Sequence, residues 1–288
     1  MRPRDLPEAH RAITRAAQEH VEWRRDYAHT EAGVSDLLVV TELLRTRLPL
    51  AVLYLVSEPM RDLALDAARD VPDGVRMGDA IPTAQGVITY SGGLPELPRG
   101  AGPGIVSWSQ IESGDLLMCA WSRDTALPPE RRDPHSFTEV RAGGWSLTGV
   151  GMVPALEPVE SWAALGPIQR RLGSLLYATW TMMAMPTVAQ AREAITTDAR
   201  ASVPERDRVR PVKVIDLRRL VHRSGSGVPG DGEGDREYRH RWVVRGHWRQ
   251  QAHGPGRSLR RTTWVQPHVK GPEGAPFLPA ETVFVWRR

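Results

Sequence analysis

Residues 236–270 have the sequence REYRHRWVVRGHWRQQAHGPGRSLRRTTWVQPHVK, which is the most unusual part of the chain. These 35 residues include eight arginines, one lysine and a single acid, together with four histidines and three tryptophans. The first half alternates in residue type, as is typical of a half-buried β-strand. Because successive side chains of a strand point to opposite faces, Trp242 and Trp248 are expected on a packed face and His247 on a cationic face with the arginines.

The second half of this segment predicts a return strand. Residues 252–261, AHGPGRSLRR, contain two glycines and a proline, which suit a long loop. Residues 262–270, TTWVQPHVK, resume a β-type pattern with β-branched and aromatic residues. Further strands are expected at 209–217 and 282–286, so the C-terminal region is predicted to be a basic antiparallel β-sheet.

Upstream of this sheet, the pattern predicts an α-rich N-terminal region. Helices are expected at 6–29, 35–47 and 57–70, the last with Ser57 before Glu58 and Pro59 as a helix start prefers. Four short β-type runs follow, separated by Gly, Pro and charged loops, and predict a small mixed or antiparallel sheet. These runs lie at 86–90, 104–110, 115–122 and 144–150.

A long packing helix is expected within residues 159–195, where apolar residues recur at spacings of three and four and Pro186 ends or bends the helix. The fold class is therefore α+β, with a mixed α+β domain at 1–200 and a basic antiparallel β-sheet domain at 201–288. Residues 223–235, RSGSGVPGDGEGD, are expected to form a flexible loop because they cannot bury enough apolar surface. That loop is either a solvated connector or an acidic lid over the cationic face.

The charge is divided unequally along the chain. Residues 201–288 hold 16 Arg and 2 Lys against 9 acids, a net charge of +9, so the total of +4 leaves −5 for residues 1–200. Such asymmetry favours an anionic partner for the C-terminal part. Nucleic acid, with RNA favoured, is the first candidate, and an acidic protein is the second.

Several classes of protein are disfavoured by the sequence. Cys119, the only cysteine, lies in the apolar run LLMCAW and is expected to be a buried structural thiol, which rules out an intrachain disulfide. No apolar run approaches 20 residues, and the polar start MRPRDLPEAH does not resemble a signal peptide, so we expect a cytoplasmic protein with no membrane partner. The phosphate loop GxxxxGK[ST], the zinc helix HExxH and the elbow GxSxG are missing, and neither a cofactor nor a metal is expected.

The titratable residues of the hairpin suggest one catalytic mechanism. His247, His268 and Lys270 could cleave a phosphodiester without a metal, with one imidazole removing a proton from a ribose 2′-hydroxyl and the other imidazole or Lys270 protonating the leaving oxygen. This mechanism requires a strand register that brings His268 next to His247. The candidate phosphate-binding residues are Arg239, Arg241, Arg245, Arg249, Arg257, Arg260 and Arg261.

The same residues are compatible with other functions. The histidines and arginines could bind phosphate without cleaving it, in which case the protein is a nucleic-acid-binding module whose affinity depends on salt. The cationic sheet could instead dock an acidic protein without any enzymatic activity. A third possibility is an enzyme for a phosphorylated or nucleotide small molecule, which predicts a concave pocket at the cationic face.

The elements RGHWR and W-x-x-PH-x-KG resemble the C-terminal part of an uncharacterised family of proteins encoded on the chromosomes, plasmids and prophages of GC-rich bacteria. The resemblance covers about the last 50 residues and implies a mobile-element setting, which favours a toxin, defence or nucleic-acid-handling role. It also implies that the matching positions form one structural unit. Those positions are Arg245, Gly246, His247, Arg249, Trp264, Pro267, His268, Lys270 and Gly271.

Overall fold

A computed structural model of the chain divides into two compact units, residues 1–218 and residues 219–288. The structure describes residues 2–27, 34–94, 104–123, 141–142, 144–194, 211–218, 241–272 and 274–276.

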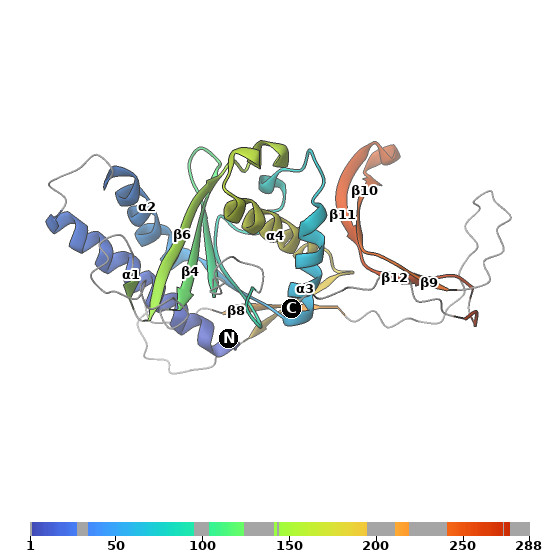
Figure 1. The fold of residues 1–288 in the computed structure, drawn as a ribbon, viewed down its shortest axis with the longest axis horizontal. Helices are drawn as coiled ribbons and strands as arrows, with labels where there is room; N and C mark the ends of the chain where they lie inside the picture. Colours follow the sequence, from blue (N-terminus) through green and yellow to red (C-terminus); the bar gives the residue numbers. More distant parts are fainter. Residues whose placement is uncertain are drawn as a thin grey trace, which may run out of the picture. The chain divides into compact units, whose positions relative to one another are not determined.

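The first unit is built on an eight-stranded mixed sheet with the strand order β5-β6-β4-β3-β2-β1-β8-β7 (Figure 1). Strand β1 pairs in parallel with β2 on one side and with β8 on the other, whereas all other neighbouring strands are antiparallel. The strands are β1 (Val52–Val56), β2 (Gln85–Tyr90), β3 (Ile105–Gln110), β4 (Leu116–Arg123), β5 (Arg141–Ala142), β6 (Trp145–Val153), β7 (Ala189–Ala194) and β8 (Val212–Leu217).

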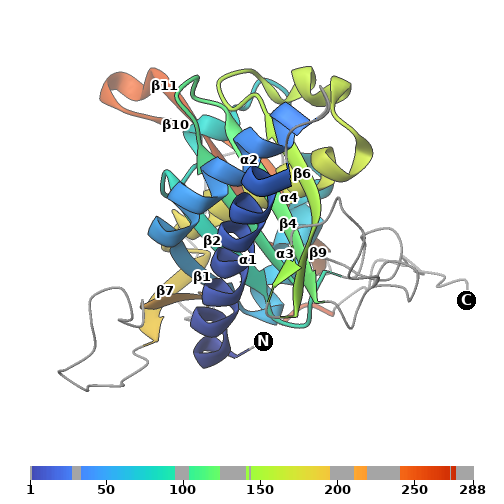
Figure 2. The ribbon, with the colours of Figure 1, turned by 90° about the vertical axis from the view of Figure 1, so that its left-hand side faces the viewer.

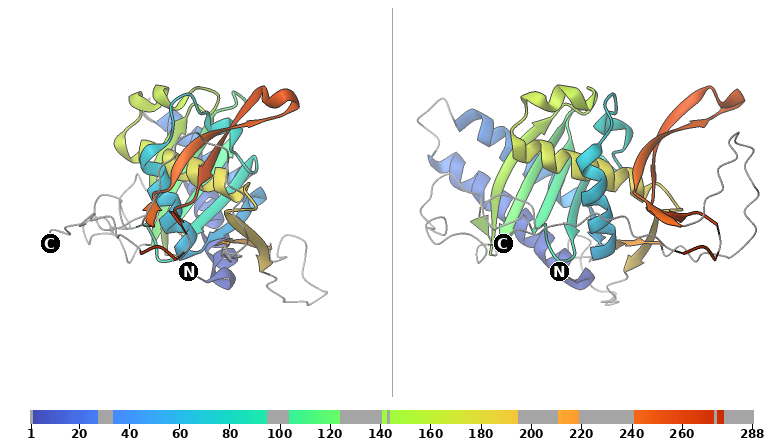
Figure 3. Two further views of the ribbon diagram at one scale, coloured as in Figure 1. Left: turned by 90° about the vertical axis from the view of Figure 1, so that its right-hand side faces the viewer. Right: turned by 45° about the vertical axis from the view of Figure 1, so that its right-hand side comes forward.

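Helices cover both faces of this sheet. Helices α1 (Leu6–Tyr27) and α2 (Val34–Arg47) lie on one face (Figure 2), and α3 (Glu58–Ala67) and α4 (Pro167–Met183) lie across the other (Figure 3). Short 3-10 helices precede α4 and follow α3, at Val159–Ala164 and Ala68–Asp70. A sheet buried on both faces suits the parallel pairing of β1, because parallel strands occur almost only where helices cover both sides.

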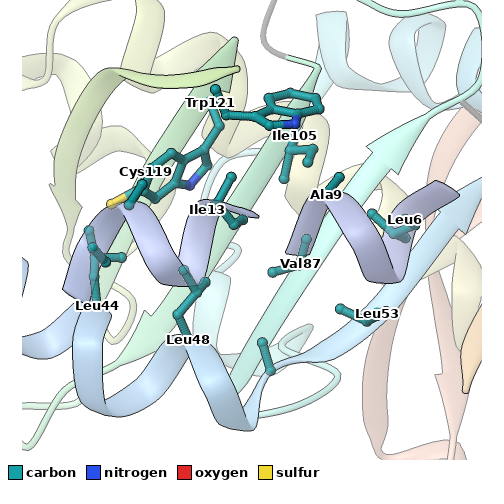
Figure 4. Packing of buried hydrophobic residues seen from close by; sticks show 14 of the residues in the cluster. Leu6, Ala9, Ile13, Leu44, Leu48, Leu53, Val87, Ile105, Cys119 and Trp121 are labelled. Atoms are coloured by element: carbon teal, nitrogen blue, oxygen red, sulfur yellow. The ribbon is translucent and has the colours of Figure 1, made fainter. Parts of the chain in front are cut away.

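The alternation of side chains along β1 divides the core into two halves. Leu53 and Leu55 belong to the buried cluster beneath α1 and α2. Figure 4 shows Leu53 in this cluster together with Ile13 and Trp121. Tyr54 points to the opposite face. Since β1 is flanked by strands on both edges and by helices on both faces, four of its five residues are buried.

Aromatic side chains fill the half of the core beneath α4. The ring of Trp108 lies 4.8 Å from that of Trp180 and 5.7 Å from that of Tyr54. The indole Nε1 of Trp108 donates a hydrogen bond to the carbonyl of Thr83, which fixes the position of the ring. Gly86 is the cross-strand partner of Trp108, and a Cβ atom at this glycine would lie only 2.1 Å from the Trp108 ring. The indole therefore covers a position that only glycine can occupy.

A buried guanidinium fixes the turn that follows β2. The Arg61 side chain is only 8 % exposed, and its NH1 donates to the carbonyl of Ser91 at 2.6 Å. The same guanidinium forms an ion pair with Asp62 at 2.7 Å. Because each buried donor needs a partner, these contacts hold α3 against the end of β2.

Cys119 is a buried thiol, as the sequence predicts. Burial raises its pKa to about 12, and a hydrogen bond with Ser107 opposes that rise. A thiol with this pKa is almost entirely protonated near neutral pH, so it is a packing residue. No helix in the described part of the chain has the length and apolar character needed to cross a membrane.

The predicted α+β class is confirmed, with an α-rich N-terminal region, a mixed middle sheet and a separate antiparallel C-terminal element. All three N-terminal helices and all four predicted β-type runs are present within a few residues of their expected bounds. The middle sheet is larger than expected, because β1, β5, β7 and β8 join the four strands that the pattern predicts.

Two segments differ from the prediction, one in its secondary structure and the other in its strand partner. The predicted helix at 159–195 ends at Met183, and residues 189–194 form strand β7, which pairs with β8. Strand β8 was expected to extend the C-terminal sheet, but it pairs with β1 in the large sheet of the first unit. Between β1 and β7, three of the six residues of β8 are buried. The predicted strand at 282–286 and the loop at 223–235 lie outside the described residues.

Candidate nucleic-acid interface

The described part of the second unit is one antiparallel hairpin whose ladder is interrupted once. Strand β9 (Trp242–Val244) pairs with β12 (His268–Lys270), and β10 (His247–His253) pairs with β11 (Leu259–Val265). The register is the same on both sides of the interruption. Two residues separate β9 from β10 (245–246), and they lie opposite the two residues that separate β11 from β12 (266–267). Pro267 is one of these four residues and has no N–H to donate to the ladder, which explains an interruption at this point.

The predicted division of β10 into a packed face and a cationic face agrees with the structure. Trp248 lies opposite Trp264, and their rings pack edge to face with centroids 5.1 Å apart. Trp264 is 3 % exposed, whereas His247 and Arg249, on the other face, are exposed. A Cβ atom at Gly246 would lie 2.4 Å from the Trp264 ring, so the chain passes this indole at a glycine.

The turn of the hairpin is shorter than predicted. Strand pairing continues to His253 and Leu259, so the loop is confined to 254–258 instead of 252–261. Gly254 and Gly256 have positive φ values of 76° and 60°, which glycine adopts readily, and Arg257 also has a positive φ of 56°. Three of the five loop residues therefore have a positive φ, and the tight turn that they form allows the strands to extend further than the loop composition suggests.

The register separates the two candidate catalytic histidines. His247 pairs with Val265, whereas His268 pairs with Val244, three positions further along the ladder. Three residues span about 10 Å of extended strand, and an odd spacing alternates between faces. A two-histidine site requires a register that brings His268 next to His247. The observed register places them three positions apart. Lys270 follows two residues after His268 and shares its face.

Each imidazole has a local backbone partner. Nδ1 of His247 lies 3.2 Å from the carbonyl of Arg245, and Nδ1 of His268 lies 3.0 Å from the carbonyl of Gln266. A carbonyl can only accept, so each ring holds a proton on Nδ1 and leaves Nε2 for another contact. These bonds orient both rings along their own strands instead of toward each other.

Most of the predicted phosphate-binding arginines lie on exposed parts of the hairpin. Arg241 is half-buried and donates from Nε to the carbonyl of Ala275 at 3.1 Å. Arg239 lies outside the described residues. The exposed arginines are Arg245, Arg249, Arg257, Arg260 and Arg261. Lys270 is exposed as well.

Arg249 and Arg261 form the clearest cationic pair of this set. The residues opposite them are Thr263 and Gln251, so the two arginines are diagonal neighbours on one face of the ladder. Diagonal neighbours in a ladder are about 7–8 Å apart, which keeps their charges close to each other. Residues 241–272 contain seven Arg or Lys residues and no Asp or Glu, so nothing within this segment neutralises them.

Within the described ranges, no group of three or more His, Cys, Asp or Glu residues is arranged to hold a metal ion. No protein-family model, curated protein or solved structure matches the chain. The resemblance of the RGHWR and W-x-x-PH-x-KG elements to a bacterial family therefore stays a prediction.

Proposed function

We propose that the protein binds nucleic acid through the hairpin of residues 241–270, with duplex DNA preferred. The observation that carries this proposal is the presence of seven cations and no carboxylate over residues 241–272. Phosphate contacts from Arg and Lys supply most of the affinity of non-specific complexes, and guanidinium groups bind phosphate through two parallel hydrogen bonds.

The form of the hairpin supports duplex DNA over the RNA that the sequence favours. Trp248 and Trp264 pack against each other, so this pair is engaged in packing and does not offer an open platform for unpaired bases. A two-stranded ribbon fits the major groove of B-form DNA, about 12 Å wide, whereas the major groove of A-form RNA is deep and narrow. These features support a binding mode in which the two-stranded ribbon contacts the phosphates of a duplex.

The proposal is binding without cleavage. General acid–base cleavage requires two proton-transfer groups at one phosphodiester, and the rungs of His247 and His268 are about 10 Å apart along the strands. We expect RNA to remain intact during incubation with the protein in EDTA. Cleavage that is lost in both His247→Ala and His268→Ala would establish the ribonuclease mechanism instead.

The binding experiment measures fluorescence anisotropy of labelled duplex DNA, duplex RNA and single-stranded RNA between about 50 and 200 mM salt. The Arg249→Gln/Arg261→Gln variant is expected to raise the Kd for duplex DNA about tenfold and to lower the salt slope by about two. Both residues are exposed, so the substitutions remove charge without disturbing the Trp248–Trp264 pair.

The matched control is Arg11→Gln/Arg15→Gln, which removes the same charge from exposed positions of α1. This control should leave the Kd and the salt slope close to the wild-type values. Equal weakening in the two variants would mean that net charge alone controls binding. A wild-type protein that binds none of the three nucleic acids would contradict the proposal and favour an acidic protein as the partner of the hairpin.

A further inference from the structure

The cationic face of the hairpin carries a glutamine beside its two diagonal arginines. Gln251 and Arg249 share this face because they are two residues apart on β10, and Arg261 of β11 lies directly opposite Gln251. Thr263, opposite Arg249, completes a group of four neighbouring side chains at the middle of the β10–β11 ladder. A partner that contacts both arginines therefore also meets Gln251.

Gln251 differs from the other members of this group in its hydrogen-bonding capacity. A guanidinium only donates, and the single hydroxyl of Thr263 already donates to the carbonyl of Arg261 at 3.3 Å. The amide of Gln251 combines an acceptor oxygen with two donor hydrogens on one planar group. The one side-chain hydrogen bond that it makes among the described residues goes from Nε2 to the carbonyl of Ala252 at 3.3 Å. The second hydrogen and the amide oxygen remain for a ligand.

We propose that Gln251 recognises one adenine in the major groove, an inference that rests on the proposed binding of duplex DNA. Adenine presents its N7 as an acceptor and its 6-amino group as a donor in this groove, and a glutamine amide matches both in a bidentate contact. The two strands of a ribbon lie about 5 Å apart, in a groove about 12 Å wide. Because Arg249 and Arg261 belong to different strands, each binds the phosphates of one groove wall while Gln251 meets the base edges.

Selection by the full chain from duplex DNA with a randomised centre, followed by fluorescence anisotropy, tests this assignment. Replacing the selected A·T pair with G·C should raise the Kd at least about fivefold, the lower end of discrimination by a bidentate base contact. Replacing the adenine with 7-deazaadenine, which pairs normally but lacks the N7 acceptor, should also raise the Kd. Binding of duplex DNA without any base preference would overturn this inference and leave the proposed function intact. Failure to bind any duplex would overturn both.

Variants of two adjacent glutamines locate the base contact. Gln251→Ala should bind the A·T and G·C duplexes equally, because the phosphate contacts remain, and Gln251→Glu, which cannot donate to N7, should also lose the preference for adenine. The matched control is Gln250→Ala, since Gln250 lies on the opposite face and donates to the hydroxyl of Thr262 at 3.0 Å. This control should keep the wild-type preference. Its loss in Gln250→Ala, or its persistence in both Gln251 variants, would refute the role of Gln251.

Discussion

The buried thiol of Cys119 is expected to make the free energy of unfolding depend on pH. Its pKa in the folded protein is about 12, above the ordinary value of 9.0, because burial disfavours the thiolate. An unfolded chain therefore releases this proton at lower pH than the folded chain does. The contribution of the thiol to stability is complete below pH 9 and is lost as the pH rises toward about 12.

We expect the free energy of unfolding of the wild type to fall by about 1.4 kcal/mol more than that of Cys119→Ala between pH 8 and pH 10. Urea unfolding at a series of pH values measures this difference. Tyr90 is also buried with a raised pKa, but it is present in both proteins and its effect cancels. Parallel pH profiles for the two proteins would show that the thiol is accessible to water in the folded state.

On the paired strands β2 and β3, the indole ring of Trp108 lies directly against Gly86. Replacing this glycine with alanine forces the indole to move, and the hydrogen bond from Trp108 to Thr83 opposes the shift. Gly86→Ala should lower the free energy of unfolding by about 1–3 kcal/mol, the usual cost of overpacking.

The matched control is Gly149→Ala on β6. There the new Cβ atom would meet only the side chain of Ala120, at an ordinary contact distance of 3.5 Å. A change of no more than about 0.5 kcal/mol is expected from this substitution. Urea unfolding distinguishes the two cases, and equal stability of both variants would mean that Trp108 can move at little cost.

The elements that the sequence reveals are those with a strong periodic pattern. The apolar stripe of α4 follows from apolar residues at spacings of three and four, and the parity of Trp248 and Arg249 follows from alternation along β10. The start of α3 follows from Ser57 before Glu58 and Pro59. Strand β1 is not predicted, because its run VLYLV is buried on both faces and shows no alternation. Strand β7, AQAREA, has the composition of a helix, and only its pairing with β8 makes it a strand.

Contacts between distant segments account for what could not be predicted of the candidate site. The cationic hairpin is evident from composition, but the separation of His247 from His268 depends on a register set by the five-residue turn at 254–258.

Among the described residues, the core of the large sheet lies within the first unit. The core cluster beneath α1 and α2 begins at Leu6 and ends at Val214, and β8 ends at Leu217. A chain that stops after Arg218 should therefore unfold cooperatively with a Tm within a few degrees of the full-length value. It should also lose binding to duplex DNA.

Circular dichroism during heating measures the Tm, and fluorescence anisotropy measures the binding of duplex DNA. A shortened chain that lacks a cooperative transition would show that residues 219–288 contribute to the core of the first unit. Retained DNA binding would assign the nucleic-acid interface to the first unit instead of the hairpin.

The strand order leaves β7 as one border of the eight-stranded sheet, and the composition of β7 affects how the protein behaves at high concentration. An unpaired border strand can recruit another chain and begin aggregation. Four of the six residues of β7 are exposed, among them Arg192 and Glu193, and Arg192 is bonded to Asp216 of β8 at 3.0 Å. A strand from another molecule would have to pair beside these charged side chains. The charges of β7 therefore oppose the addition of strands to the sheet and the formation of fibrils.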